Sequence, residues 1–241
     1  MTDVGCQRQN NEDHYSYWEP ASGQDFERKG RLAIVADGMG GHEGGQEASH
    51  MAVETIQEIY SQQPGPDPQS LLDAGFLQAH ERIRHHATEH PELTGMGTTA
   101  TAAVLLDRRL YFAHIGDSRL YLVRGERISR LTHDHSYVGR LVDNGVISPE
   151  EAEAHPQRHI LTAALGAGPE ATFDAPGQPI ALEPGDVLVL CTDGLWGLLT
   201  DQEIQQAVAR KKPDDACQAM IATAKERGGP DNITVQVLRV G

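Results

Sequence analysis

The feature that most restricts the fold is a series of short segments in which apolar and polar residues alternate. Four such segments occupy residues 98–106, 109–115, 119–124 and 127–131. A period of two residues is the pattern of a β-strand. The first two segments, and the last two, are separated by only two residues, at 107–108 and 125–126. Because turns of that length join antiparallel neighbours, the middle of the chain predicts an antiparallel sheet.

Segments with helical periodicity lie on both sides of this block. Apolar side chains recur at helical spacing in residues 45–62 and 68–89, and again in 201–210 and 214–227. Three prolines and a glycine within residues 61–68 end the first of these helices. The remaining expectations are a polar loop at 19–30 and strands at 172–180, 186–192 and 232–240. Separate blocks of strands and helices, rather than alternating β–α units, predict an α+β fold with helices outside antiparallel sheets.

Composition excludes several classes of protein. The formal net charge of −15 argues against nucleic acid or an anionic membrane as the main partner, because phosphate groups bind clustered Lys and Arg. The chain has neither an apolar run of about 18 residues nor an N-terminal signal pattern. Its three cysteines form no CxxC pair, and Cys191, inside an apolar run, is expected in the core. A reduced, cytoplasmic setting is predicted.

Four aspartates each stand where an apolar run meets a tight polar turn: Asp37, Asp117, Asp193 and Asp231. Because strand ends are rigid, these carboxylates would project from a fixed rim. If they converge, their charges repel one another and raise their pKa values unless cations lie between them. Oxygen ligands of this kind favour a hard divalent cation. The alternative is that each Asp only serves its turn, a position that Asp favours, but the four together favour the metal.

Two further side chains suit phosphate chemistry. Arg8 lies just before Glu12 and Asp13, and its planar guanidinium matches phosphate oxygens. The alternative for Arg8 is a surface ion pair with Glu12. His42 lies in the glycine-rich run 37–45, which lacks the ending of a phosphate-binding Walker loop. A histidine beside a metal centre is suited to protonate a leaving alkoxide, and the alternative is an exposed loop histidine.

Other features carry no chemistry in this interpretation. His80, with the histidines at 85, 86 and 90, follows a polar helical face and should be solvated, whereas His114 lies in a strand and should be satisfied in the core. Residues 133–168 are polar and locally helical, which indicates an insertion or lid. Within them, Ser148 is expected to cap a short helix, with Pro149 at its first position.

Six short motifs follow one another along the chain. They are Arg-Gln-Asn-Asn-Glu-Asp at 8–13, Val-Ala-Asp-Gly-Met-Gly-Gly-His at 35–42, Gly-Thr-Thr at 97–99, Gly-Asp-Ser-Arg at 116–119, Thr-Asp-Gly-Leu-Trp at 192–196 and Gly-Pro-Asp-Asn-Ile-Thr at 229–234. In sequence and order they resemble the motifs of the bacterial-type PP2C (PPM) family of metal-dependent protein phosphatases. One such motif is a weak signal, whereas six in order across nearly the whole chain are specific.

The resemblance implies a fold and a site. The implied fold is α+β: a four-layer α-β-β-α sandwich of two antiparallel sheets flanked by helix pairs, in one catalytic domain (1–241) with a flap at about 133–168. The implied cofactors are two Mn²⁺ or Mg²⁺ ions, with a third, weaker one. By resemblance, Asp37 bridges the two ions and the Gly38 carbonyl binds one of them; Asp193 and Asp231 hold the other; Glu12 and Asp13 act through bound water; Asp117 with Asp193 holds the weaker ion; Arg8 binds the substrate phosphate; and His42 is the general acid.

The implied function is hydrolysis of phosphoserine and phosphothreonine in proteins by metal-activated water. The expected partners are phosphorylated proteins, including substrates of a bacterial Ser/Thr kinase, with no nucleic acid or membrane, and the chain is expected to be a monomer. One alternative is a catalytically weak phosphoprotein-binding regulatory module, which the complete set of metal carboxylates disfavours. Another is a metal phosphodiesterase or nucleotidase, for which the sequence offers no recognisable base pocket.

The chain departs from the family pattern in two places. His159 and Ala163 stand in the flap where the family often has Asn and Arg, which puts flap-dependent substrate preference in doubt. Arg8 follows so soon after the first residue that the first strand is expected to be short.

Overall fold

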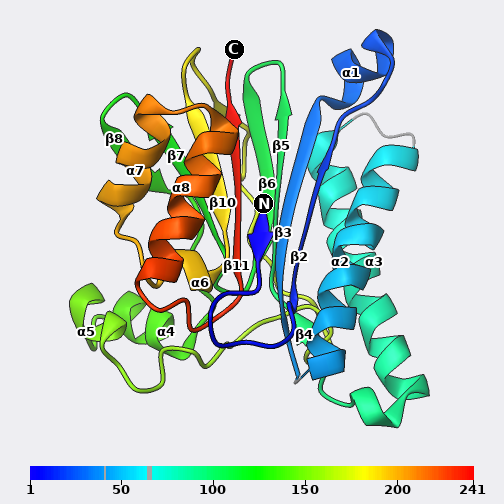
Figure 1. Cartoon of the computed structure of the whole chain (residues 1–241). Coiled ribbons are helices and arrows are strands. Elements are labelled where there is room, and N and C mark those ends of the chain that lie inside the picture. The colour runs from blue at the N-terminus through cyan, green and yellow to red at the C-terminus, as the bar shows by residue number, and fades with distance from the viewer. Residues whose placement is uncertain (41, 64–66) are drawn as a thin grey trace.

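Two antiparallel sheets lie face to face at the centre of the molecule, with helices on their outer faces (Figure 1). The structure, a computed structural model, describes residues 1–40, 42–63 and 67–241, with every side chain in these ranges except those of His42 and Glu153. Helices α2 (His42–Gln62) and α3 (Pro68–Glu89) cover one sheet, and α7 (Asp201–Arg210) and α8 (Pro213–Glu226) cover the other. The predicted α+β sandwich of four layers is confirmed.

All paired strands in the described ranges are antiparallel. The first sheet contains, in spatial order, β1 (Thr2–Asp3), β11 (Ile233–Arg239), β10 (Val187–Cys191), β7 (Arg119–Arg124) and β8 (Arg127–Arg130). The second contains β2 (Asp13–Trp18), β3 (Arg31–Met39), β5 (Ala100–Leu106), β6 (Arg109–Ile115) and β9 (Ile180–Ala181), and β4 (Gly97–Thr98) pairs with β3. Both predicted hairpins form. In the β5–β6 turn, Asp107 and Arg108 have φ angles of 48° and 55°, as a tight primed turn requires.

Strand β3 shows how the layers share one apolar run. Leu32 and Ile34 pack toward α2 and α3, whereas Ala33 and Val35 pack between the two sheets. Because both faces of the strand are buried, the sequence shows continuous apolar residues rather than alternation. The carboxyl end of this strand, which carries Asp37, is therefore held rigidly from both sides.

Two secondary-structure predictions are wrong. Residues 23–29 form a helix, α1 (Gly23–Lys29), where a loop was expected, and Ser22 caps it. Residues 172–179 form no strand beyond a single bridge from Asp174 to His114. Pro176 and Pro179 lie in this segment, and each lacks the backbone N–H that a strand ladder needs.

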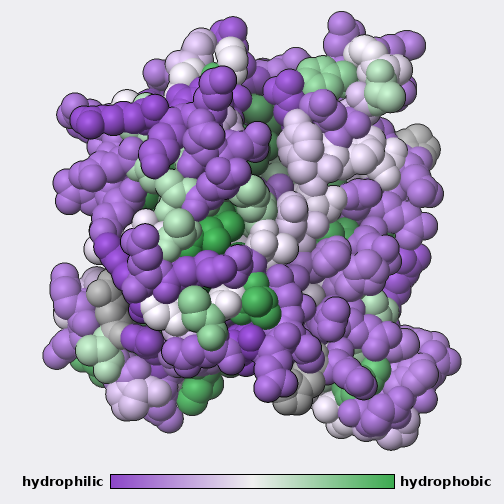
Figure 2. Space-filling model, viewed as in Figure 1, coloured by the Kyte–Doolittle hydropathy of each residue, from purple (hydrophilic) through white to green (hydrophobic). Residues whose placement is uncertain are grey.

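The short helices lie in connecting segments. Residues 133–168 contain α4 (Tyr137–Asp143) and α5 (Pro149–Glu153), and the predicted capping box at Ser148 is confirmed. A 3₁₀ turn, η1 (Pro91–Leu93), follows α3, and α6 (Asp193–Trp196) follows β10. Within the described ranges, no helix combines the length and apolar character needed to cross a membrane. Hydrophilic side chains cover most of the face seen in Figure 2, in keeping with the net charge of −15.

The burial of the histidines differs in part from the prediction. His80 is only 1% exposed and its Nδ1 accepts a hydrogen bond of 3.1 Å from Gly166 N, so the predicted solvation is wrong for this residue. His85, further along α3, and His90, the residue after this helix, are exposed as predicted. His114 is fully buried, as predicted. Its Nε2 donates to the His133 carbonyl at 2.8 Å, and Nδ1 meets Thr101 Oγ1 at 2.8 Å.

Acid is expected to destabilise the fold through His114. Burial lowers the pKa of this imidazole to about 4, so between that value and its ordinary value near 6.5 the unfolded chain binds the extra proton. The contribution is fully present above pH 6.5 and disappears as the pH falls toward 4, on the order of 3 kcal/mol in all. Urea unfolding of the parent and of His114→Gln between pH 4 and 7 measures it. The free energy of unfolding should fall less steeply with acid in the variant than in the parent. An equal dependence on pH in both proteins would contradict the assignment.

Candidate active site

Strand ends from both sheets bring the predicted carboxylates to one edge of the sandwich. Asp13, the first residue of β2, lies opposite Asp37 of β3 in register. From the other sheet, β10 leads through Thr192 to Asp193, and Asp231 lies just before β11. Asp117 lies in the turn between β6 and β7. One detail differs from the prediction: β3 continues past Asp37 to Met39, so Asp37 lies within the strand and not in a turn after it.

Glycines follow two of these aspartates because backbone segments pass very close to them. A Cβ on Gly38 would stand 2.0 Å from the Gly45 carbonyl oxygen, and one on Gly194 would stand 1.9 Å from that of Asn232. Neither position has room for a side chain. A side chain on Gly45 would in turn collide with Glu12 Oε2, so Glu12 lies against the first turn of α2. The glycine after Asp37 or Asp193 thus marks close packing rather than a turn.

Hydroxyl and amide side chains fix the carboxylate-bearing backbone, and sequence analysis assigned them no role. Thr99 Oγ1 accepts from Asp37 N at 2.9 Å, and Thr98 Oγ1 donates to the Asp37 carbonyl at 2.9 Å. Thr192 Oγ1 donates to Asp13 Oδ2 at 2.8 Å, and Asn232 Oδ1 accepts from Glu12 N at 2.8 Å. All four lie inside the motifs at 97–99, 192–196 and 229–234, which was the available signal.

The electrostatics show that the carboxylates act on one another. Burial, followed by the charges of Asp13, Asp193, Asp117 and Asp231, raises the pKa of Asp37 well above its ordinary value. Burial also raises the pKa of Asp13 to about 7, against the opposing hydrogen bonds from threonine hydroxyls. The pKa of Asp117 is raised by burial and then by the charge of Asp193. Without a cation, Asp13, Asp37 and Asp117 favour their protonated forms.

The donor set fits a hard divalent cation. Asp13 Oδ1 and Asp193 Oδ1 are buried, and neither has a hydrogen-bond partner among the described residues. Buried carboxylate oxygens are costly unless a cation or donor compensates them. Within the same residues, no three His, Cys, Asp or Glu side chains stand close enough to hold an ion as they are. A cation would relieve the repulsion among the carboxylates and satisfy both oxygens.

Arg8 reaches this cluster. Its Nη2 lies 2.8 Å from Asp231 Oδ2, and half of its side chain is exposed. Hydrogen bonding to Asp231, together with the charges of Asp231, Glu12 and Asp37, raises its pKa against the effect of burial. The ion pair with Asp231 was not anticipated.

The structure places one histidine side chain, that of His159, beside the carboxylates. The side chain of His42 lies outside the described residues, so its predicted role as general acid stays a prediction. Sequence analysis assigned no site role to His159, whose Nδ1 lies 3.8 Å from Asp193 Oδ2.

Comparison with known proteins shows the family of this chain. The family described as Protein phosphatase 2C matches residues 7–232. Protein phosphatase PhpP of Streptococcus pneumoniae is 36% identical over 99% of this chain and 95% of its own. Serine/threonine protein phosphatase PstP of Mycobacterium tuberculosis is 38% identical over 99% of this chain and 44% of its own. A crystal structure of the PstP catalytic domain in complex with two manganese ions covers 100% of this chain and 96% of that one, with 35% identity and a TM-score of 0.84. This chain belongs to the protein phosphatase 2C family and is a metal-dependent protein phosphatase.

Proposed function

We propose that this phosphatase hydrolyses phosphoserine and phosphothreonine in proteins, using two Mn²⁺ or Mg²⁺ ions. The ions are held by the carboxylate edge, which is the edge of the sandwich that carries Asp13, Asp37, Asp117, Asp193 and Asp231. The observation that carries the proposal is the pair of buried, unpartnered oxygens on Asp13 and Asp193, within a cluster in which burial and the neighbouring carboxylates raise the pKa of Asp37. The relatives named serine/threonine phosphatases, and the neighbour containing two manganese ions, support the same proposal.

Each residue has a proposed role. Asp37 would hold both ions and the Gly38 carbonyl one of them, Asp193 and Asp231 would hold the other, Glu12 and Asp13 would hold water bound to the ions, and Asp117 with Asp193 would hold a weaker third ion. When bound, such ions supply Lewis acidity and an activated water for attack on phosphorus. Arg8 orients the phosphate through its guanidinium, and His42 protonates the leaving alkoxide. Bulk water does not reach the buried Oδ1 atoms of Asp13 and Asp193.

The direct test is hydrolysis of a phosphothreonine peptide with excess Mn²⁺. Turnover that a chelator abolishes is the expected result. Binding of the phosphopeptide without turnover would favour the regulatory-module alternative. Faster hydrolysis of bis-p-nitrophenyl phosphate or of nucleoside monophosphates than of phosphopeptides would favour the phosphodiesterase or nucleotidase alternative.

Replacing Arg8 with alanine is expected mainly to raise KM, by about tenfold, since a phosphate clamp contributes binding that ground state and transition state share. Steady-state kinetics on the phosphothreonine peptide measure the effect. Arg31→Ala is a suitable control, because Arg31 also forms an exposed ion pair, 3.0 Å from Glu19, but at the opposite end of β3 from Asp37. A large loss of kcat at unchanged KM would contradict the clamp.

Replacing Asp117 with alanine is expected to lower turnover by about 10- to 100-fold while leaving tight metal binding nearly unchanged. The reason is that Asp117 belongs to the proposed weaker site, whereas Asp37 and Asp231 hold the tight ions. Calorimetric Mn²⁺ titration beside turnover separates the two effects. Equal losses of tight binding and turnover would contradict the role of Asp117.

The cellular setting is proposed from charge and from the relatives. The phosphatase acts on phosphorylated proteins, including substrates of a bacterial Ser/Thr kinase, in the cytoplasm. A net charge of −15 disfavours nucleic acid and anionic membranes as partners. Residues 1–241 form one catalytic domain, and residues 133–168 are a flap beside the site. The chain is monomeric, and light scattering on the purified protein should give one chain's mass of 26.2 kDa.

A further inference from the structure

Beside the carboxylate edge, one buried arginine contacts segments that are far apart in the sequence. Arg119 is the first residue of β7, and its side chain is only 15% exposed. Its Nε and Nη2 donate to the two carboxylate oxygens of Asp134 at 3.0 and 2.7 Å, and its Nη1 donates to the Tyr121 hydroxyl at 3.1 Å. A two-point pair of this kind fixes orientation as well as distance.

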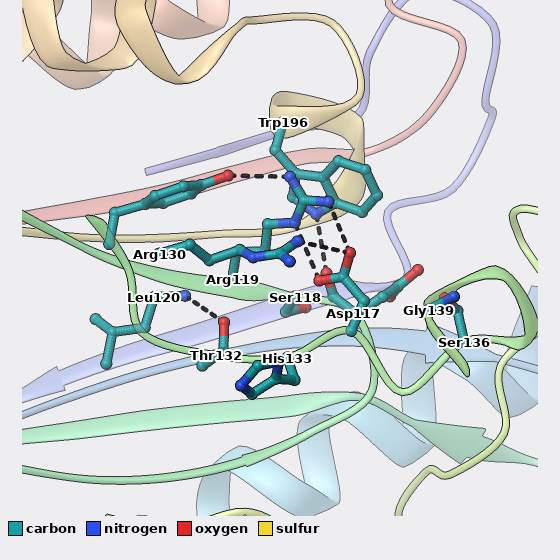
Figure 3. Close-up of polar contacts among 12 residues, drawn as sticks. Asp117, Ser118, Arg119, Leu120, Arg130, Thr132, His133, Ser136, Gly139 and Trp196 are labelled. Carbon is teal, nitrogen blue, oxygen red and sulfur yellow. Dashed lines mark hydrogen bonds and ion pairs between the residues drawn. The ribbon is translucent and has the colours of Figure 1, made fainter. Parts of the chain in front are cut away.

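Trp196 lies against the same guanidinium (Figure 3). The Arg119 Cζ atom is 3.5 Å from the centroid of the indole ring, and Trp196 Nε1 donates to the Asp117 carbonyl at 2.9 Å. Trp196 is the last residue of α6, and Asp193 is the first. One indole therefore links the turn that carries Asp117 to the helical turn that carries Asp193.

Asp134 stands at the beginning of the segment 133–168, which returns to the same place at Thr162. The next residue, His135, donates its N–H to the Gly116 carbonyl at 2.7 Å, and its Nδ1 accepts from Gly116 N at 3.2 Å. Later in the segment the chain returns to the same point, because Thr162 N donates to the His135 carbonyl at 2.8 Å. The base of the segment thus rests directly on the turn that contains Asp117.

We propose that Arg119 is a positioning residue for the phosphatase reaction: together with Trp196 and Asp134, it sets Asp117 relative to Asp193 and couples both to the base of segment 133–168. This inference rests on the proposed role of Asp117 and Asp193 in holding the weaker ion. Ordering of the segment base and binding of that ion then favour each other, since coupling between two sites is reciprocal.

The chain contains a matched arginine that separates positioning from simple stabilisation. Arg124 lies at the opposite end of β7, and its Nε and Nη2 also bind a carboxylate at two points, Asp186, at 2.9 and 2.7 Å. Asp186 is 2% exposed. This pair has the same chemistry as Arg119–Asp134 but lies away from the carboxylate edge. Lysine cannot reproduce the two-point geometry in either pair.

The test compares Arg119→Lys and Trp196→Phe with Arg124→Lys. Both arginine variants are expected to have a lower melting temperature than the parent. Arg119→Lys should weaken the weaker phase of Mn²⁺ binding about 10- to 100-fold while changing the tight phase about twofold or less. It should also speed amide hydrogen exchange at His135 and Thr162 in the metal-free protein. Arg124→Lys should leave both binding phases, and the exchange at these two amides, as in the parent.

Two outcomes would overturn the inference. The first is loss of thermal stability in Arg119→Lys with the weaker phase and the exchange unchanged, which would make Arg119 only a stabilising residue. The second is a Trp196→Phe protein whose weaker Mn²⁺ phase and amide exchange equal those of the parent. This variant keeps the aromatic face over Arg119 but loses the donor to Asp117. It tests the inference if Arg119→Lys does not fold. A parent without a weaker Mn²⁺ phase would refute the role of Asp117 in the proposed function. In that case the metal-free hydrogen exchange still decides whether Arg119 orders the segment base.

Discussion

Replacing Asp37 with asparagine is expected to abolish phosphatase activity and, at the same time, to stabilise the metal-free protein. The activity should fall by about a thousandfold or more, since loss of a bridging ligand removes several kcal/mol of transition-state stabilisation. The stability should rise because burial and four neighbouring carboxylates hold the pKa of Asp37 well above its ordinary value. A neutral amide of the same shape removes that repulsion.

Melting curves with chelator and with Mn²⁺, alongside peptide turnover, check both halves of this result. Asp186→Asn is the matched control, because Asp186 is a buried carboxylate with a cationic partner, Arg124, at 2.7 Å. That variant should lose stability with or without metal and keep its turnover. An Asp37→Asn protein that turns over peptide near the parental rate, or that is less stable than the parent in chelator, would contradict the assignment.

Saturating Mn²⁺ is expected to raise the melting temperature of the parent strongly. Binding at 100 times Kd contributes about 2.7 kcal/mol per site, which for a chain of this size corresponds to about 5–10 °C. The increase should be larger at pH 8 than at pH 6. Burial raises the pKa of Asp13 to about 7, so in the metal-free protein stability falls as pH rises through that value. At pH 6, moreover, protons compete with the metal.

Differential scanning calorimetry at both pH values, with Mn²⁺ or chelator, measures this effect. Asp231→Ala should show a smaller increase and no turnover. If Mn²⁺ raises the melting temperature of the parent equally at pH 6 and pH 8, the buried carboxyls do not control metal binding.

Most of the elements could be predicted from local pattern alone. The strands at 109–115 and 119–124 and the helices at 68–89 and 201–210 have the predicted bounds, because each carries a clear apolar period. Helix α1 was missed because it contains no buried residue and so has no apolar period to detect. The strand expected at 172–180 failed because an apolar run is not sufficient when prolines interrupt its hydrogen bonding.

The residues of the site could also be predicted only in part. Its carboxylates were recognisable from their places in six ordered motifs. The side chains that hold them were not, because Thr192 contacts Asp13 across 179 residues and Thr99 contacts Asp37 across 62. No local spacing encodes such contacts. Arg119 and Trp196 also lie inside recognised motifs, yet their shared contact depends on how β7 and α6 meet.

The sequence by itself determined the family, the antiparallel α+β architecture and the kind of chemistry, since these follow from residue types, their period and their order along the chain. Only the tertiary structure decided which oxygens of Asp13 and Asp193 lack a partner, that Arg8 contacts Asp231, and that His80 is buried. The physical reason is that burial and charge interactions depend on distances through space. Two sheets must pack before carboxylates from five separate segments can act on one another.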